Sequence, residues 1–181
     1  MKIFTLEHAP ASYFADFVLY PLTIAASVAA LLVHQPVARW PGLALICLLG
    51  LVAWSLMEYA LHRYILHGVQ PFKRWHAEHH DRPFALIGTS TIASLLLFAV
   101  LVFLPLAALV GKWPALAATV GVMIGYLFYV TVHHASHHWK ARGAWMQTRK
   151  RAHARHHLTG NHGWYGVTTS FWDRVFSSTG D

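Results

Sequence analysis

The stretch PALAATVGVMIGYLFYVTVHHASHH, residues 114–138, joins a long apolar run to four histidines. Its apolar part, Pro114 to Val132, is close to the length of about 20 residues that a helix needs to cross about 30 Å of hydrocarbon. The histidines follow without a break, at the point where such a helix would leave the bilayer. The stretch therefore predicts a membrane helix with imidazoles gathered at its end.

Three further apolar runs of similar length precede it. With 56% hydrophobic and 12% charged residues and a mean hydropathy of +0.41, the chain is too apolar for an ordinary soluble domain. We expect an all-α integral membrane protein, one domain over residues 1–181, with four transmembrane helices. Their expected positions are about 17–33, 43–65, 92–110 and 114–132.

Single residues in or beside these apolar runs give further expectations. Asp16 abuts the first run and no small-residue cleavage site follows it, so we expect a retained helix rather than a signal peptide. Pro105 falls inside the third run, where neighbouring helices can tolerate a kink or local break. The single cysteine, Cys47, excludes an internal disulfide and is expected to be a small core residue.

Lysine and arginine are distributed very unevenly. If the four helices alternate in direction, the turns at residues 36–41 and 111–113 carry only Arg39 and Lys112, and the other side carries the remaining twelve cations. This bias predicts that both termini and the long connection from Leu66 to Thr91 are cytoplasmic. It also accounts for most of the net charge of +7, so no nucleic-acid partner is needed to explain that charge.

The histidines form four groups, at residues 62–67, 76–80, 133–138 and 153–157, and every group is on the predicted cytoplasmic side. HAEHH and HARHH each place three imidazoles at i, i+3 and i+4, on one face of a helix. His133 and His137 are also one turn apart. His62 and His67 are five residues apart, about 140° around an ideal helix, which suits a helix end that wraps around a site.

Imidazole suits iron, copper, zinc and nickel, and the number of candidate ligands exceeds what one ion can use. Two metals with about five nitrogens each would leave positions for oxygen or water, as in catalytic sites. The predicted ligands are His62, His67, His76, His79, His80, His133, His137, His153, His156 and His157.

The sequence does not decide the role of several residues near the predicted ligands. His134 and His138 share a face offset from the predicted ligands, and His162 follows in a glycine-rich turn, so metal contact is undecided for all three. His8 and His34 lie outside the groups and are expected to be solvated helix-cap partners or interfacial residues. For Glu58, Glu78 and Asp81 we weigh hydrogen bonds to ligating imidazoles against helix-end ion pairs with Arg63 or Arg82.

The segments EYALHRYILH, WHAEHH, VHHASHH, HARHH and WYGVTTSFWDRVF, in this order, resemble the membrane-bound fatty acid hydroxylase and sterol desaturase superfamily. The resemblance covers Glu58 to Phe176. It implies a four-helix anchor with a cytosolic histidine-rich di-metal site, normally two iron ions, that uses O2 and two electrons. The superfamily's histidines fall on the ten candidates above. Zinc in purified or crystallised protein would not contradict iron in the cell, because imidazole sites bind zinc at least as well.

The resemblance also carries expectations about partners and place. A membrane lipid, with a fatty acyl, sterol or sphingoid chain, is the expected substrate, and apolar residues near LIGTSTIASLLLF and WYGVTTSFW are candidates for its channel. No cytochrome b5 domain is recognised, so we expect a separate ferredoxin, rubredoxin or cytochrome b5 type of donor, steered by the basic face. Compactness favours a bacterial inner membrane. The tail reads FSSTGD where the superfamily commonly has FGT.

Three functions remain in view at this stage. The leading hypothesis is a lipid hydroxylase, and the second is a desaturase or carotenoid-ring hydroxylase of the same superfamily. The third is a membrane metal-binding or transport protein. A transporter would place its ligands near the middle of the bilayer, whereas these histidines gather at one face, so the enzymatic hypotheses are favoured.

Overall fold

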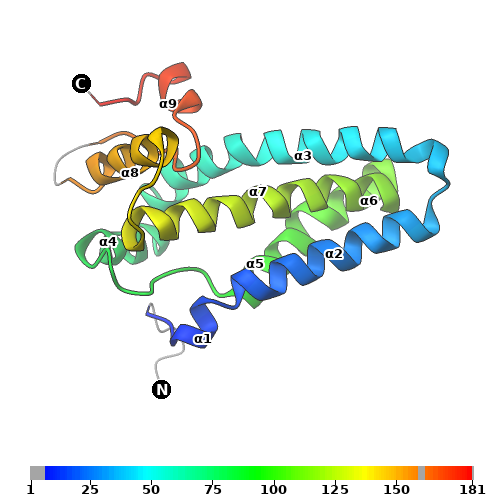
Figure 1. Cartoon of the computed structure of the whole chain (residues 1–181), viewed down its shortest axis with the longest axis horizontal. Helices are drawn as coiled ribbons and strands as arrows, with labels where there is room; N and C mark the ends of the chain where they lie inside the picture. Colours follow the sequence, from blue (N-terminus) through cyan, green and yellow to red (C-terminus); the bar gives the residue numbers. More distant parts are fainter. Residues whose placement is uncertain (1–6, 159–161, 181) are drawn as a thin grey trace. The chain divides into compact units, whose positions relative to one another are not determined.

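The computed structural model describes residues 7–158 and 162–180, and its regular elements are helices (Figure 1). Within those ranges the one β-type pairing is an isolated bridge between Glu7 and Ile87. The prediction of an all-α protein is confirmed. In chain order the elements are α1 (Pro10–Tyr13), α2 (Asp16–His34), the 3₁₀ turn η1 (Val37–Arg39), α3 (Trp40–Ala60), the π-turn η2 (Leu61–Leu66), α4 (Phe72–Asp81), α5 (Thr91–Phe98), the π-turn η3 (Ala99–Phe103), α6 (Leu104–Val110), α7 (Lys112–His138), α8 (Ala144–His156) and α9 (Phe171–Val175).

Four helical segments in the described part of the chain are long and apolar enough to cross a membrane. They are Pro10–His34, Val37–Leu66, Thr91–Val110 and Lys112–His138. Each contains one of the predicted runs, so the prediction of four transmembrane helices is confirmed. The fourth continues six residues beyond the predicted end at Val132, and the histidines of HHASHH therefore lie on the helix itself.

Contacts divide the chain into two compact units. The first holds the described residues up to Trp54 together with Leu86–Leu127, and the second holds Ser55–Ala85 together with the described residues from Phe128 onward. Helices α3 and α7 each contribute residues to both.

In the first unit, α7 packs tightly against α3 through glycine. Gly121 approaches α3 so closely that a Cβ there would lie 1.9 Å from the Cys47 carbonyl oxygen, and a Cβ at Gly50 would lie 2.2 Å from the Ala118 carbonyl oxygen. Small residues permit this approach, which is a common way for membrane helices to associate. Large apolar side chains such as Leu22 and Leu96 remain about 60% exposed, as expected for helices that face lipid.

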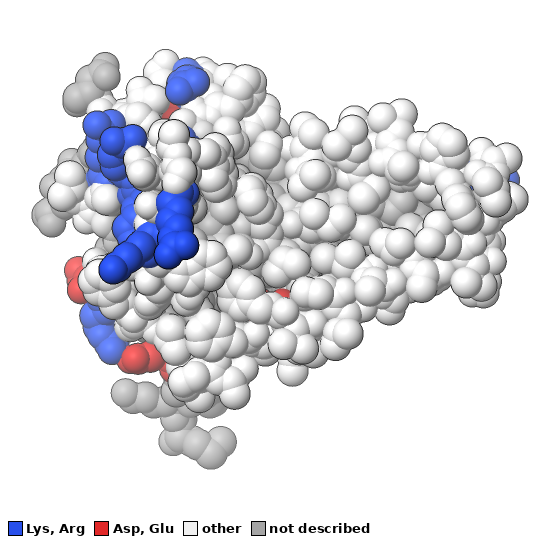
Figure 2. All heavy atoms as spheres, viewed as in Figure 1, with Lys and Arg blue, Asp and Glu red and all other residues white. Residues whose placement is uncertain are grey.

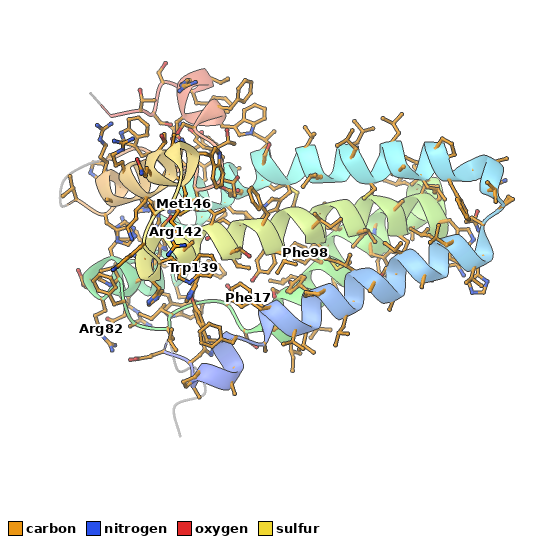
Figure 3. The ribbon with its side chains drawn as sticks, in the orientation of Figure 1. Phe17, Arg82, Phe98, Trp139, Arg142 and Met146 are labelled. Carbon is orange, nitrogen blue, oxygen red and sulfur yellow. The ribbon has the colours of Figure 1, made fainter. Side chains whose placement is uncertain are left out.

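Polar and aromatic contacts also join the helices of the first unit. The Tyr20 hydroxyl donates to the Ser94 Oγ at 2.8 Å, and the Tyr126 hydroxyl donates to the Asp16 carboxylate at 3.2 Å. Phe98, labelled in Figure 3, packs edge-on against Tyr126 with ring centroids 5.3 Å apart. An ionisable group in a membrane helix needs such a partner, because an isolated charge in hydrocarbon is costly.

The third membrane segment contains the break that Pro105 predicts. Because proline has no N–H to donate, it interrupts the α-helical hydrogen bonds. Here the interruption takes the form of η3, in which the Leu104 N–H donates to the Ala99 carbonyl oxygen five residues back. Pro105 itself lies in the first turn of α6, where its missing N–H costs nothing.

Candidate metal centre

The predicted ligands gather in the second unit as two sets of imidazoles. In each set the ligand nitrogens lie within 4.8 Å of one another. The five-histidine set is His62, His67, His76, His80 and His156. The four-histidine set is His79, His133, His137 and His153. Side chains from η2 and the residue that follows it, from α4, from α7 and from α8 thus meet at two points.

His157, the tenth predicted ligand, lies beside both sets. Its Nε2 is 3.1 Å from the His153 Nε2 in the four-histidine set. Its ring stacks on His80 of the five-histidine set, with centroids 4.2 Å apart and planes at 13°. The ten predicted histidines therefore lie together, with His157 at the junction of the two sets.

The π-turn η2 explains how His62 and His67 reach one set. On an ideal α-helix five residues apart would leave them about 140° apart. In η2 the His67 N–H instead donates to the His62 carbonyl oxygen at 3.2 Å, an i→i+5 bond. The wider turn brings the two rings to a centroid distance of 5.2 Å. Single π-turns of this kind are frequent at functional sites.

Each HxxHH segment is divided between the two sets. On α4, His76 and His80 are one turn apart and join the five-histidine set, whereas His79 joins the other. On α8, His153 joins the four-histidine set and His156 joins the five-histidine set. Same-face spacing therefore does not bring all three rings to one point, because the i+3 position is offset from i and i+4 around the helix.

The distances within the sets fit metal coordination. The Nε2 atoms of His62 and His76, of His76 and His80, and of His67 and His156 are each 3.0 Å apart. In the four-histidine set the corresponding distances are 3.1 Å for His79 and His133 and 2.7 Å for His137 and His153. Two imidazole nitrogens bound about 2.1 Å from one metal, at right angles, are themselves about 3 Å apart.

Backbone carbonyls hold two of the rings in the orientation that a ligand needs. The His62 Nδ1–H donates to the Tyr165 carbonyl oxygen at 2.6 Å, and the His156 Nδ1–H donates to the Gly163 carbonyl oxygen at 2.8 Å. A neutral ring that donates from Nδ1 keeps its lone pair on Nε2. The Nε2 atoms of His62 and His156 therefore keep a lone pair that can bind a metal cation.

Burial keeps several of these imidazoles neutral at physiological pH. It lowers the pKa of His67 to about 4, of His79 and His156 to about 3, and of His157 to about 2. Neighbouring imidazoles add to this effect because a second positive charge would be repelled. Burial also lowers the pKa of His80, although the adjacent Asp81 carboxylate opposes the shift. Neutral imidazole is the form that binds metal.

The three acidic residues singled out in the sequence lie in different surroundings. The buried Glu58 carboxylate accepts the N–H groups of Val167 and Thr168 at 2.8 and 2.9 Å, and the Thr168 hydroxyl at 2.6 Å. Glu78 pairs with Arg82 at 3.2 Å on the surface. Asp81 is exposed next to His80. A direct role of these carboxylates in orienting imidazoles stays a prediction.

The histidines left open in the sequence lie outside both sets. His134 and His138 stack on each other, with ring centroids 4.5 Å apart. His162 is exposed, and its charge helps to lower the pKa of His67. Sequence reasoning missed Gly163 and Tyr165, because an accepting backbone carbonyl has no residue signature. The available signal was the segment WYGVTTSFW, which contains Tyr165, but it was interpreted as part of a substrate channel.

Comparison with known proteins identifies the family of this chain. A family model described as fatty acid hydroxylase matches residues 47–178. The chain belongs to this family. All ten histidines and the segment that supplies the two carbonyls fall within the matched residues.

Alignments with two named relatives cover most of this chain. The dihydroceramide fatty acyl 2-hydroxylase FAH2 of Arabidopsis thaliana is 31% identical over 150 residues, 77% of this chain and 62% of its own length. The fatty acid 2-hydroxylase of Homo sapiens is 29% identical over 159 residues, 80% of this chain and 41% of its own. This chain therefore spans less than two thirds of either relative.

A solved structure has the same fold. Full-length scs7p, of which only the hydroxylase domain is visible, superposes with a TM-score of 0.78 at 21% identity, covering 96% of this chain and 67% of that one.

Proposed function

We propose that this protein is an O2-dependent lipid hydroxylase in which the two histidine sets hold two iron ions. The observation that carries the proposal is the convergence of nine imidazoles from four separate segments into two sets of a metal-ligand geometry, with His157 beside both. All-imidazole ligation favours a transition metal over magnesium or calcium. A lipid substrate is supported by the family and by the four apolar helices.

The relatives' names refine the proposed reaction. They describe hydroxylation of fatty acids and of dihydroceramide fatty acyl chains at position 2. We therefore favour hydroxylation of an acyl chain next to its carbonyl over desaturation or carotenoid-ring hydroxylation. In this reaction one atom of O2 is inserted into the C–H bond. The other atom takes up two electrons and two protons and leaves as water.

The chain and the metal would divide the work. Two bound iron ions would supply the O2 chemistry needed to break an unactivated C–H bond, for which side chains have no suitable group. The imidazoles supply neutral nitrogen ligands, and the Tyr165 and Gly163 carbonyls fix the rings of His62 and His156. Orientation of ligands by such hydrogen bonds tunes how firmly a metal is held.

Electrons must reach the site from a donor, and the exposed face of α8 offers a place for one. Lysine and arginine side chains gather over α8 and the segment before it (Figure 2). A shallow hollow of ≈ 260 Å³ there is lined in part by Lys150 and Arg151. Arg142 and Trp139 lie in the preceding segment (Figure 3). We propose that an acidic ferredoxin, rubredoxin or cytochrome b5 docks here, on the cytoplasmic side that the twelve-to-two cation bias predicts.

Lipid analysis of a host that expresses the protein tests the function. Wild type should convert a lipid into a product heavier by one oxygen atom, and His156→Ala should abolish the product. His34→Ala, which changes an exposed histidine at the end of α2, serves as the matched control and should retain the product. Loss of two hydrogen atoms would instead establish desaturation. An unchanged lipid profile with wild type would overturn the proposal and favour metal transport.

A further inference from the structure

The C-terminal loop, residues 163–178 including α9, is closed by its own hydrogen bonds. The Trp164 N–H donates to the Ser178 carbonyl oxygen at 2.8 Å, and the Ser178 N–H donates to the Asp173 carbonyl oxygen at 2.7 Å. The space inside the loop is tight, because a Cβ at Gly166 would lie 1.9 Å from the Thr169 carbonyl oxygen. The loop therefore has little freedom to change shape once it has formed.

Asp173 is the centre of this loop. Its side chain is fully buried, with 0% exposed. Its Oδ1 accepts the Tyr165 N–H at 2.8 Å and the Ser178 hydroxyl at 2.9 Å, and its Oδ2 accepts the Gly166 N–H at 2.9 Å. These bonds fix the peptide units on both sides of Tyr165. They consequently set the direction of the Tyr165 carbonyl.

The Tyr165 carbonyl and the Gly163 carbonyl both accept hydrogen bonds from the five-histidine set. The Tyr165 oxygen accepts from His62, and the Gly163 oxygen accepts from His156. Both rings belong to the five-histidine set. This set is thus braced by the loop through two Nδ1–H groups.

The four-histidine set lacks a comparable brace at two of its members. The Nδ1 atoms of His79 and His153 are buried, and no hydrogen-bond partner for them occurs among the residues that the structure describes. The same holds for the Nδ1 of His157 at the junction of the sets. Rings that bind through Nε2 are normally held at Nδ1 by a carboxylate or carbonyl, and loss of such a partner typically weakens metal binding about 10- to 100-fold.

We propose that the two sets hold their metals with unequal strength, that the five-histidine set fills first, and that Asp173 is the positioning residue responsible for its tighter binding. This inference rests on the proposed function in one respect, namely that both sets hold a metal.

Titration of the full chain in detergent with Co²⁺ alone, after removal of metal with a chelator, tests the order of filling. Visible absorption of the bound ion and equilibrium dialysis would give the affinity and stoichiometry of each step. We expect two steps that differ by about tenfold or more. His67→Ala should remove the tighter step, and His153→Ala should remove the weaker one.

Variants of the loop test the role of Asp173. Asp173→Asn keeps the shape of the side chain but replaces one of its two accepting oxygens with an NH2 group, so the tighter step should weaken about tenfold while the weaker step is unchanged. Ser178→Ala removes one bond to Asp173 and should act in the same direction with a smaller effect. Arg174→Gln, at the next, exposed position of α9, is the matched control and should change neither step.

Each outcome bears on the inference in a distinct way. Two equal steps in wild type would overturn it while leaving the proposed two-metal site intact, and absence of Co²⁺ binding would overturn both. If Asp173→Asn weakens the weaker binding step, or changes neither step, Asp173 does not have the proposed positioning role. If Asp173→Asn fails to fold, as judged by circular dichroism, the wild-type order and Ser178→Ala decide the question.

Discussion

At the scale of single residues, Glu58 illustrates how a buried carboxylate organises this protein through backbone rather than through a cation. It lies in a membrane-spanning segment and accepts two N–H groups and one hydroxyl from the Val167–Thr168 stretch of the C-terminal loop. A buried acceptor of this kind satisfies donors that would otherwise be stranded without water. The carboxylate thus ties the end of α3 to the loop that braces His62.

Glu58→Ala should lower the free energy of unfolding by about 1–3 kcal/mol, because it strands the Val167 and Thr168 N–H groups. Thermal or denaturant unfolding in detergent, followed by circular dichroism, would measure the loss. Glu78→Gln provides the comparison, since an exposed pair such as Glu78–Arg82 is worth at most about 1 kcal/mol. Equal effects of the two substitutions would contradict this assignment.

The metal-free chain should become less stable as the pH falls below about 6.5. Burial lowers the pKa of His67 to about 4 and of His79 to about 3 in the folded chain, from an ordinary value of 6.5. Between these values the unfolded chain binds protons that the folded chain excludes, so acid favours unfolding. Above about pH 6.5 both states are neutral at these rings and the effect disappears.

Unfolding temperatures of chelator-treated protein across this pH range would measure the effect. The temperature should be level near pH 7–8 and should decline steadily toward about pH 4. A profile that stays level down to about pH 4 would show that these imidazoles are not desolvated in the folded chain.

At the scale of elements, hydropathy was sufficient to predict the four membrane helices, and histidine spacing singled out ten histidines that lie together in the structure, whereas their role as metal ligands stays a prediction. Long apolar runs leave few alternatives in a membrane, because only helices satisfy their own backbone there. Helix geometry offsets His79 from His76 and His80, but which partners each ring meets was beyond prediction, since that depends on where other helices approach α4. The π-turn was also missed, because the spacing of His62 and His67 was measured on an ideal α-helix.

The close approach of α7 and α3 in the first unit gives a test at this scale. Gly121→Ala would put a methyl group 1.9 Å from the Cys47 carbonyl oxygen and 2.8 Å from the Leu51 nitrogen, so the helices must move apart. We expect a loss of about 1–3 kcal/mol in unfolding free energy, typical of overpacking. Gly42→Ala, on α3, meets nothing within 4 Å and should not destabilise the protein. If both variants unfold alike, the glycine contact is not what holds these helices together.

At the scale of the whole molecule, lysine and arginine are distributed unevenly, and this distribution is the basis of the proposed donor surface. The cations exposed on α8 and before it include Arg142 and Arg151, and Arg151 precedes His153 of the four-histidine set by two residues. Because His153 is buried and Arg151 is exposed on one helix, only about the 10–12 Å width of that helix separates the basic surface from the four-histidine set. An electron carrier docked on α8 would therefore be close to the metals.

Charge reversal at Arg142 and Arg151 should weaken the use of an acidic donor without changing the chemistry. In steady-state hydroxylation with a purified acidic ferredoxin, the double variant should show a several-fold higher KM for the donor and an unchanged kcat at saturating donor. The expected cause is long-range attraction between the basic surface and the acidic donor. The difference in KM between the double variant and wild type should therefore shrink above about 0.1 M salt, where the screening length falls to about 10 Å.

A control and a readout of the metals separate this effect from damage to the site. Lys112→Glu reverses a cation on the turn between α6 and α7, which the charge bias assigns to the opposite side of the membrane, and should leave the KM for the donor unchanged. Metal content of the double variant should equal that of wild type, because neither arginine belongs to a histidine set. A fall in kcat with an unchanged KM would mean that these cations act on the catalytic step, and an effect insensitive to salt would exclude electrostatic docking, since charges on an exposed surface are screened by ions.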